Sequence, residues 1–68
     1  MKLNYAKALL ELRSKLNISQ TEMAALLNVS YPSVNRWENG RAVPIKIARV
    51  RFEKMCKENN IEIEEVAE

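Results

Sequence analysis

The sequence predicts an all-α fold, a compact bundle of four or five helices, and three observations support this. Hydrophobic residues make up 47% of the 68 residues, and the chain has one glycine and two prolines, a composition that suits helices better than a turn-rich sheet. Apolar side chains recur at helical spacing in successive segments. Two of those segments open with a serine that can cap a helix, and only a tight turn separates them. A chain of this length forms one small domain.

The first helix is expected over residues 4–16. One stripe of its surface holds Ala6, Leu9, Leu10, Arg13 and Leu16, with Leu12 at its edge. Such a stripe packs against the rest of a bundle, and an arginine within it usually extends its charged head to water.

The second helix is expected to begin after Ser19. Glu22 follows three residues later, and this spacing predicts a capping box in which each side chain bonds the other residue's backbone N–H. The apolar residues that recur at helical spacing, and that we expect in the core, are Met23, Ala24, Leu26 and Leu27.

The third helix is expected to begin after Ser30, with Pro32 in its first turn, where the missing N–H breaks no intrahelical bond. One side of this helix carries Val34, Trp37 and Glu38, and we expect Trp37 in the core. The other side carries Pro32, Ser33, Asn35, Arg36 and Asn39. Hydroxyl, amide and guanidinium groups are those that recognise base edges in a DNA major groove, although many polar helix faces are simply solvated.

Pro44 is expected to open a fourth helix as its first residue. Its core side would hold Ile45, Ala48, Phe52 and Met55. Asn59 and Asn60 then break the helix. Residues 61–64 alternate like a strand, but their pattern also permits a fifth helical turn.

The net charge of +2 is small, and its distribution is more informative. Residues 30–57 hold seven Lys and Arg against two acids, whereas residues 58–68 hold five Glu and no basic residue. This asymmetry fits a phosphate-facing side and an acidic end turned away from it, although ordinary solvated helices could also produce it. The lone Cys56, the lack of a long apolar stretch and the lack of a signal-peptide pattern predict a soluble, cytoplasmic domain.

An enzyme is not expected. The chain has no His, one Cys, no glycine-rich phosphate loop and no metal-ligand spacing. We therefore expect no catalytic residue, no metal and no cofactor.

A set of residues in register resembles the Cro/lambda-repressor (XRE-like) helix-turn-helix DNA-binding family. The resemblance is carried by Ser19-Gln20, by Met23-Ala24-x-Leu26-Leu27-Asn28-Val29-Ser30 and by Ser33-Val34-x-Arg36-Trp37-Glu38-Asn39-Gly40-x-x-x-Pro44. With the segment around Leu12 and Arg13 it covers roughly residues 4–55. It implies a lambda-repressor-like domain that inserts the helix at about residues 31–39 into the major groove. It also implies a transcriptional repressor or regulator that binds a pseudo-palindromic operator as a homodimer, with half-sites about 34 Å apart.

The resemblance also implies the site residues. Base contacts map onto Tyr31, Pro32, Ser33, Asn35 and Arg36, and phosphate contacts onto Ser19, Gln20, Asn39, Arg41 and Lys46. Gln20 would in addition brace the recognition helix. Arg13 is expected to form a largely buried ion pair with Glu38. Tyr31 and Pro32 depart from the more common polar residues, and they could contact a thymine methyl group, contact the sugar backbone or simply pack.

We expect residues 1–58 to form the DNA-binding domain and residues 59–68 an acidic tail. The tail is a candidate dimerisation segment through Ile61, Ile63 and Val66. One alternative function is a protein-interaction module with secondary DNA binding, such as an antitoxin that holds a toxin through this tail. RNA binding is less favoured, because Tyr31 is the only good candidate for base stacking.

Overall fold

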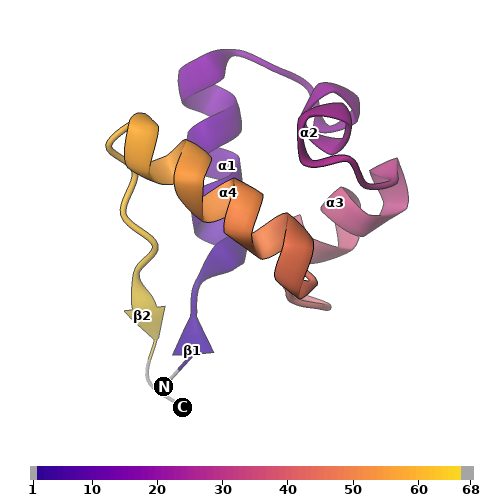
Figure 1. The fold of residues 1–68 in the computed structure, drawn as a ribbon. Helices are drawn as coiled ribbons and strands as arrows, with labels where there is room; N and C mark the ends of the chain where they lie inside the picture. The colour runs from indigo at the N-terminus through magenta and orange to yellow at the C-terminus, as the bar shows by residue number, and fades with distance from the viewer. Residues whose placement is uncertain (1, 67–68) are drawn as a thin grey trace.

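The computed structural model describes residues 2–66, which form four helices and one short antiparallel ribbon (Figure 1). The elements are β1 (Lys2–Leu3), α1 (Tyr5–Leu16), α2 (Gln20–Leu27), α3 (Tyr31–Glu38), α4 (Lys46–Glu58) and β2 (Glu65–Val66). The predicted all-α architecture is confirmed, with the four-helix alternative correct. Residues 61–64 form neither a fifth helical turn nor a strand, and the chain instead returns so that β2 pairs with β1, Leu3 opposite Glu65.

Polar side chains cap the first three helices. The Asn4 side chain accepts a hydrogen bond from the Lys7 N–H at 3.1 Å, which starts α1. Ser19 and Glu22 form the predicted capping box, with both reciprocal bonds at 3.0 Å. Ser30 accepts from the Ser33 N–H and so starts α3. Each cap satisfies an N–H that has no partner within its helix.

The expected start of α4 at Pro44 is wrong. The helix begins at Lys46, its N-cap is Ile45, and no side chain caps it. Pro44 lies before the helix and is buried. Because proline favours an extended conformation in the residue before it and cannot donate a hydrogen bond, it suits this buried approach to the helix as well as a first helical position.

All four helices end in the same way, at a residue in the left-handed conformation. These residues are Asn17, Asn28, Gly40 and Asn60, with φ of 56°, 58°, 72° and 58°. In each case the next N–H reaches back to a carbonyl five residues earlier, as from Arg41 to Arg36 at 3.0 Å. This is the Schellman motif, and asparagine is the residue that most often replaces glycine in it. Three asparagines therefore fix where α1, α2 and α4 stop.

Replacing Gly40 by alanine is expected to destabilise the protein by about 1–2 kcal/mol, because a Cβ is disfavoured at a positive φ. No atom lies within 4 Å of the position of that Cβ, so the backbone conformation is the only source of the loss. Thermal unfolding should show a lower Tm by about 4–8 °C per kcal/mol. Gly40→Asn is the matched control and should lose less, and equal melting of Gly40→Ala and wild type would contradict the argument.

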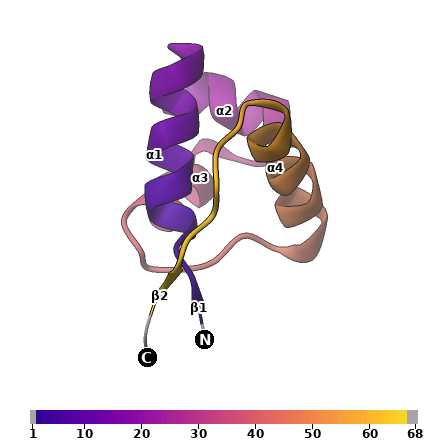
Figure 2. The same ribbon diagram turned by 90° about the vertical axis from the view of Figure 1, so that its left-hand side faces the viewer.

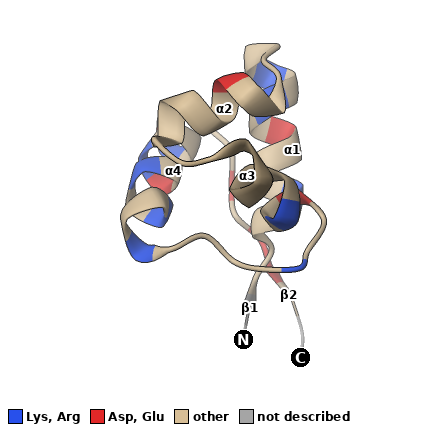
Figure 3. Ribbon diagram, turned by 90° about the vertical axis from the view of Figure 1, so that its right-hand side faces the viewer, with Lys and Arg blue, Asp and Glu red and all other residues tan. Residues whose placement is uncertain are grey.

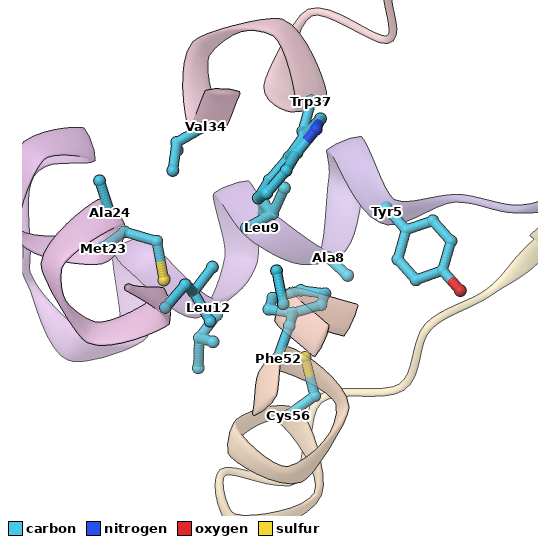
Figure 4. Close-up of a cluster of buried hydrophobic side chains, with 12 residues drawn as sticks. Tyr5, Ala8, Leu9, Leu12, Met23, Ala24, Val34, Trp37, Phe52 and Cys56 are labelled. Carbon is cyan, nitrogen blue, oxygen red and sulfur yellow. The ribbon is translucent and has the colours of Figure 1, made fainter. Parts of the chain in front are cut away.

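The core lies where α1, α2, α3 and α4 meet, and Figure 4 shows most of its side chains. The rings of Tyr5 and Phe52 are 6.4 Å apart at their centroids and tilted by 57°, a favourable aromatic arrangement. Trp37 is 3% exposed, which confirms its expected place in the core. The buried hydrophobic residues are Tyr5, Ala8, Leu9, Leu12, Met23, Ala24, Leu27, Val34, Trp37, Ala48, Phe52 and Cys56. Burial, with smaller contributions from Glu53 and Glu11, raises the pKa of the Cys56 thiol to about 11.

Three residues expected in the core lie at the surface. Leu10 is 47% exposed, Leu26 is 51% exposed and Ile45 is 63% exposed. On α1 the buried side is centred nearer to Ala8 and Leu12, so the predicted stripe was rotated too far. Leu26 borders the true core position Leu27 on a helix of only eight residues. Ile45 precedes its helix, so helical spacing does not apply to it.

The segment after α4 packs against the body of the domain. It runs alongside α1 and brings β2 next to β1 (Figure 2). Ile61 and Ile63 are partly buried against the core. The Glu64 carbonyl accepts from the Asn4 N–H at 2.7 Å, and the Glu64 carboxylate lies 2.6 Å from the Lys7 Nζ. This ion pair raises the pKa of Lys7, but both side chains are half exposed, so it contributes little stability.

None of the helices within residues 2–66 has the length and apolar character needed to cross a bilayer.

Candidate nucleic-acid interface

Helix α3 is held by its inner side and presents its outer side to solvent. It packs against both α1 and α2, and only residues 28–30 separate it from α2. Val34 and Trp37 are buried beneath it, and the Glu38 side chain is 4% exposed. The predicted division of the helix into an apolar inner side and a polar outer side is therefore present.

The five residues expected to contact bases are not equally accessible. Tyr31, Pro32 and Arg36 are exposed, with Tyr31 47% accessible. Ser33 is half-buried, and its hydroxyl lies 3.0 Å from that of Ser30. Asn35 is also half-buried and makes side-chain hydrogen bonds within the protein. Arg36, in the last turn of α3, is thus the one long hydrogen-bond donor that this helix presents freely.

The five residues expected to contact phosphates lie in two groups. Ser19 and Gln20 are at the start of α2, whereas Asn39, Arg41 and Lys46 span the exit from α3 and the start of α4. Gln20 is half-buried and the other four are exposed. Figure 3 shows basic residues on α3, on α4 and on the loop between them. These basic residues give the surface a positive potential. The N–H groups at the start of α2 that have no partner within the helix, and the positive end of the helix dipole, add to it, so the surface is suited to anions.

Arg13 and Glu38 form a two-point ion pair that joins α1 to α3. The Arg13 Nε donates to Glu38 Oε2 at 2.7 Å, and Nη2 donates to Oε1 at 2.9 Å. The Arg13 side chain is 23% exposed, and its Nη1 also donates to the Ile18 carbonyl at 3.2 Å. Burial acts to raise the pKa of Glu38, but the hydrogen bonds from Arg13 and Gln20 and the charge of Arg13 together outweigh it and lower this pKa.

Gln20 extends this pair into a chain of side-chain amides. Its Nε2 donates to Glu38 Oε1 at 2.8 Å, and its Oε1 accepts from Asn35 Nδ2 at 3.3 Å. Asn35 Oδ1 in turn accepts from Asn39 Nδ2 at 3.2 Å. From the sequence we expected Asn35 and Asn39 on the outer face and Gln20 as a brace for the helix at residues 31–39, but not the hydrogen bonds that link these three amides. The spacing of Asn35 and Asn39, four residues apart on one helix, was the available signal.

A family model described as helix-turn-helix matches residues 9–50, more than half of the chain. The matched segment runs from the middle of α1 into α4 and contains every residue of both contact sets. The chain belongs to the helix-turn-helix family, and its type is that of the Cro/lambda-repressor (XRE-like) proteins. It is therefore a DNA-binding regulator by family. No curated protein and no solved structure matches the chain.

Proposed function

We propose that this protein binds double-stranded DNA sequence-specifically and represses transcription by occupying an operator. The single observation that carries the proposal is the exposed Arg36 in the last turn of a short helix whose other side is anchored in the core. A guanidinium in this position can donate two hydrogen bonds to guanine O6 and N7 when the helix enters the major groove. Tyr31 and Pro32, at the start of the same helix, would lie against the adjacent bases or sugars.

The flanking groups would position the helix without specifying sequence. Ser19 and Gln20 lie at the start of α2, and Asn39, Arg41 and Lys46 follow α3, so phosphates could be held on either side of the groove. Such contacts supply affinity and orientation, whereas base contacts supply specificity.

Arg36→Ala and Arg41→Ala are expected to change different properties of DNA binding. Loss of Arg36 should weaken the preference for one base pair by about 1–3 kcal/mol. Loss of Arg41 should weaken binding to all sequences and reduce the slope of log K against log salt by about 0.9. Fluorescence anisotropy with selected and scrambled duplexes at several salt concentrations separates the two effects. Lys57→Ala, which removes a charge from the far end of α4, should change neither the base preference nor the salt dependence. An unchanged slope in Arg41→Ala would exclude Arg41 from the interface.

Two copies of the chain are proposed to bind the two halves of a pseudo-palindromic site. Of the three expected dimer residues, Ile61 and Ile63 are already partly buried within one chain, and Val66 is 37% exposed. The most exposed large apolar side chains lie close together in the sequence, and they are Val43, Ile45, Ile47 and Val50, which are 62%, 63%, 70% and 59% exposed. Exposed apolar side chains that gather on one part of a surface mark association sites, so we propose residues 43–50 as the better candidate for the contact between copies.

Ile47→Ser tests this contact. Sedimentation on a selected duplex should show two copies of the wild-type protein per duplex and one copy of the variant. Leu26→Ser removes an exposed apolar side chain on another helix and should leave the ratio at two. Two copies of Ile47→Ser per duplex would exclude residues 43–50 as the essential contact, and a wild-type ratio of one would exclude the dimer.

A further inference from the structure

We infer that Glu38, acting through Gln20, fixes which way the amide of Asn35 faces and thereby selects the base that Asn35 contacts. Glu38 and Gln20 are positioning residues in this inference, since neither need touch the base. The inference rests on the proposed function, because it requires α3 to lie in the major groove.

The chain of amides has a direction that begins at Glu38. An ionised carboxylate only accepts hydrogen bonds. The Glu38 side chain is nearly buried, and Arg13 already donates to both of its oxygens. Gln20 lies 2.8 Å from Glu38 Oε1 and must therefore present its NH₂ group there. With the opposite orientation, the Gln20 oxygen would face a carboxylate oxygen, with two acceptors in contact and no proton between them.

Each hydrogen bond in this row of amides fixes the orientation of the next side chain. With its NH₂ on Glu38, Gln20 presents its oxygen to Asn35, so Asn35 must present its NH₂ at 3.3 Å. The Asn35 oxygen then faces Asn39, whose Nδ2 donates at 3.2 Å. The three amides cannot rotate independently, because reversing Gln20 or Asn35 breaks its bonds to both neighbours and reversing Asn39 breaks its bond to Asn35. In isolation, each amide could be reversed freely.

A fixed amide carries sequence information that a freely rotating one lacks. Asn35 uses one N–H and one oxygen lone pair in the chain and keeps one of each. These match the N7 acceptor and the N6 donor of adenine. Across the width of the groove, an A·T pair presents the two groups in the opposite order from a T·A pair. Asn35, with its donor side toward α2 and its acceptor side toward the end of α3, is therefore suited to adenine on one strand.

Selection of binding sites from a random duplex pool tests the inference with four proteins: wild type, Asn35→Ala, Gln20→Met and Thr21→Val. Asn35→Ala identifies the base pair that Asn35 contacts, as the position where preference is lost. Gln20→Met keeps the length of the side chain and the Arg13–Glu38 pair but cannot hydrogen-bond. In the wild type, a good two-point contact should prefer adenine over thymine at this position by about 5- to 150-fold. In Gln20→Met this preference should fall to less than about 3-fold. The position contacted by Arg36 should be unchanged.

The controls distinguish a loss of base preference at the Asn35 position from a loss of affinity for all sequences. If Gln20 also holds a phosphate, Gln20→Met lowers affinity for all sequences alike, without changing the profile at one position. Thr21→Val alters the neighbouring exposed residue and should leave every preference intact. Full retention of the adenine preference in Gln20→Met would overturn the inference, as would an Asn35→Ala protein that loses preference nowhere.

A measurement without DNA tests the amide chain by itself. In NMR spectra of ¹⁵N-labelled protein, the side-chain NH₂ signals of Asn35 and Asn39 should shift in Gln20→Met, and the Asn35 protons should exchange faster with solvent. Unchanged Asn35 signals would overturn the chain whatever the binding data show. A protein with the expected NMR changes that selects no duplex would instead contradict the proposed function, and the base-selecting role would be lost with it.

Discussion

Glu38→Ala is expected to destabilise the protein by about 3–5 kcal/mol, because it leaves the Arg13 guanidinium beneath α3 without its charge partner. The carboxylate is 4% exposed and accepts three hydrogen bonds, two from Arg13 and one from Gln20. A domain of this size has only about 3–10 kcal/mol of total stability, so this loss should remove a large share of it.

Urea unfolding monitored by Trp37 fluorescence measures this loss. Glu11→Ala is the matched control, since Glu11 lies 3.9 Å from Lys7 and both side chains are about half exposed. Its loss should be below about 0.5 kcal/mol. Replacing Arg13 and Glu38 together by leucine should recover much of the stability, because no unpaired charge remains. Unfolding of Glu38→Ala at the wild-type urea concentration would show that the pair contributes nothing.

The same pair predicts how stability depends on pH. The pKa of Glu38 is lower in the folded protein than the unfolded value of 4.5, so the unfolded state binds more protons in the acid range. The contribution of the pair is therefore fully present above about pH 4.5 and is lost as the pH falls through the folded pKa. The Arg13/Glu38 double leucine variant should show a weaker loss of stability over this range.

Phe52→Ala should cost about 3–5 kcal/mol for a different reason, the cavity left in the core. Phe52 is completely buried, lies against Tyr5 and brings α4 onto α1. Phe52→Leu is the control and should lose clearly less, because it retains most of the apolar volume. The same urea titration measures both variants. A loss below about 1 kcal/mol in Phe52→Ala would mean that α4 is not essential to the core.

Much of the fold follows from local signals in the sequence. Ser19 and Ser30 correctly place the starts of α2 and α3, because a cap depends only on nearby residues. The ribbon could not be foreseen, since strands of two residues have no alternation to detect and their pairing joins opposite ends of the chain. Leu10 and Leu26 were misplaced because each lies beside a true core position, and helical spacing alone cannot locate the edge of a buried face.

The pairing of Arg13 with Glu38 was expected from the resemblance and not from a physical pattern in the sequence. Taken alone, Arg13 in an apolar stripe predicts a head extended to water, and nothing in the spacing connects it with Glu38, which lies 25 residues away. The inward turn of Asn35 depends on Gln20 from another helix. A helical projection places Asn35 near the edge of the outer face but contains no information about a neighbouring helix.

The central claim is that α3 contacts base edges through Arg36. Parallel selection from a random duplex pool by wild type and Arg36→Ala, at two salt concentrations, tests it most directly. We expect wild type to enrich an inverted repeat, and Arg36→Ala to enrich the same repeat with one symmetric G·C position relaxed. If no sequence is enriched and binding is lost at moderate salt, only general attraction between cations and phosphates remains. That result would contradict the claim and favour a protein-interaction role.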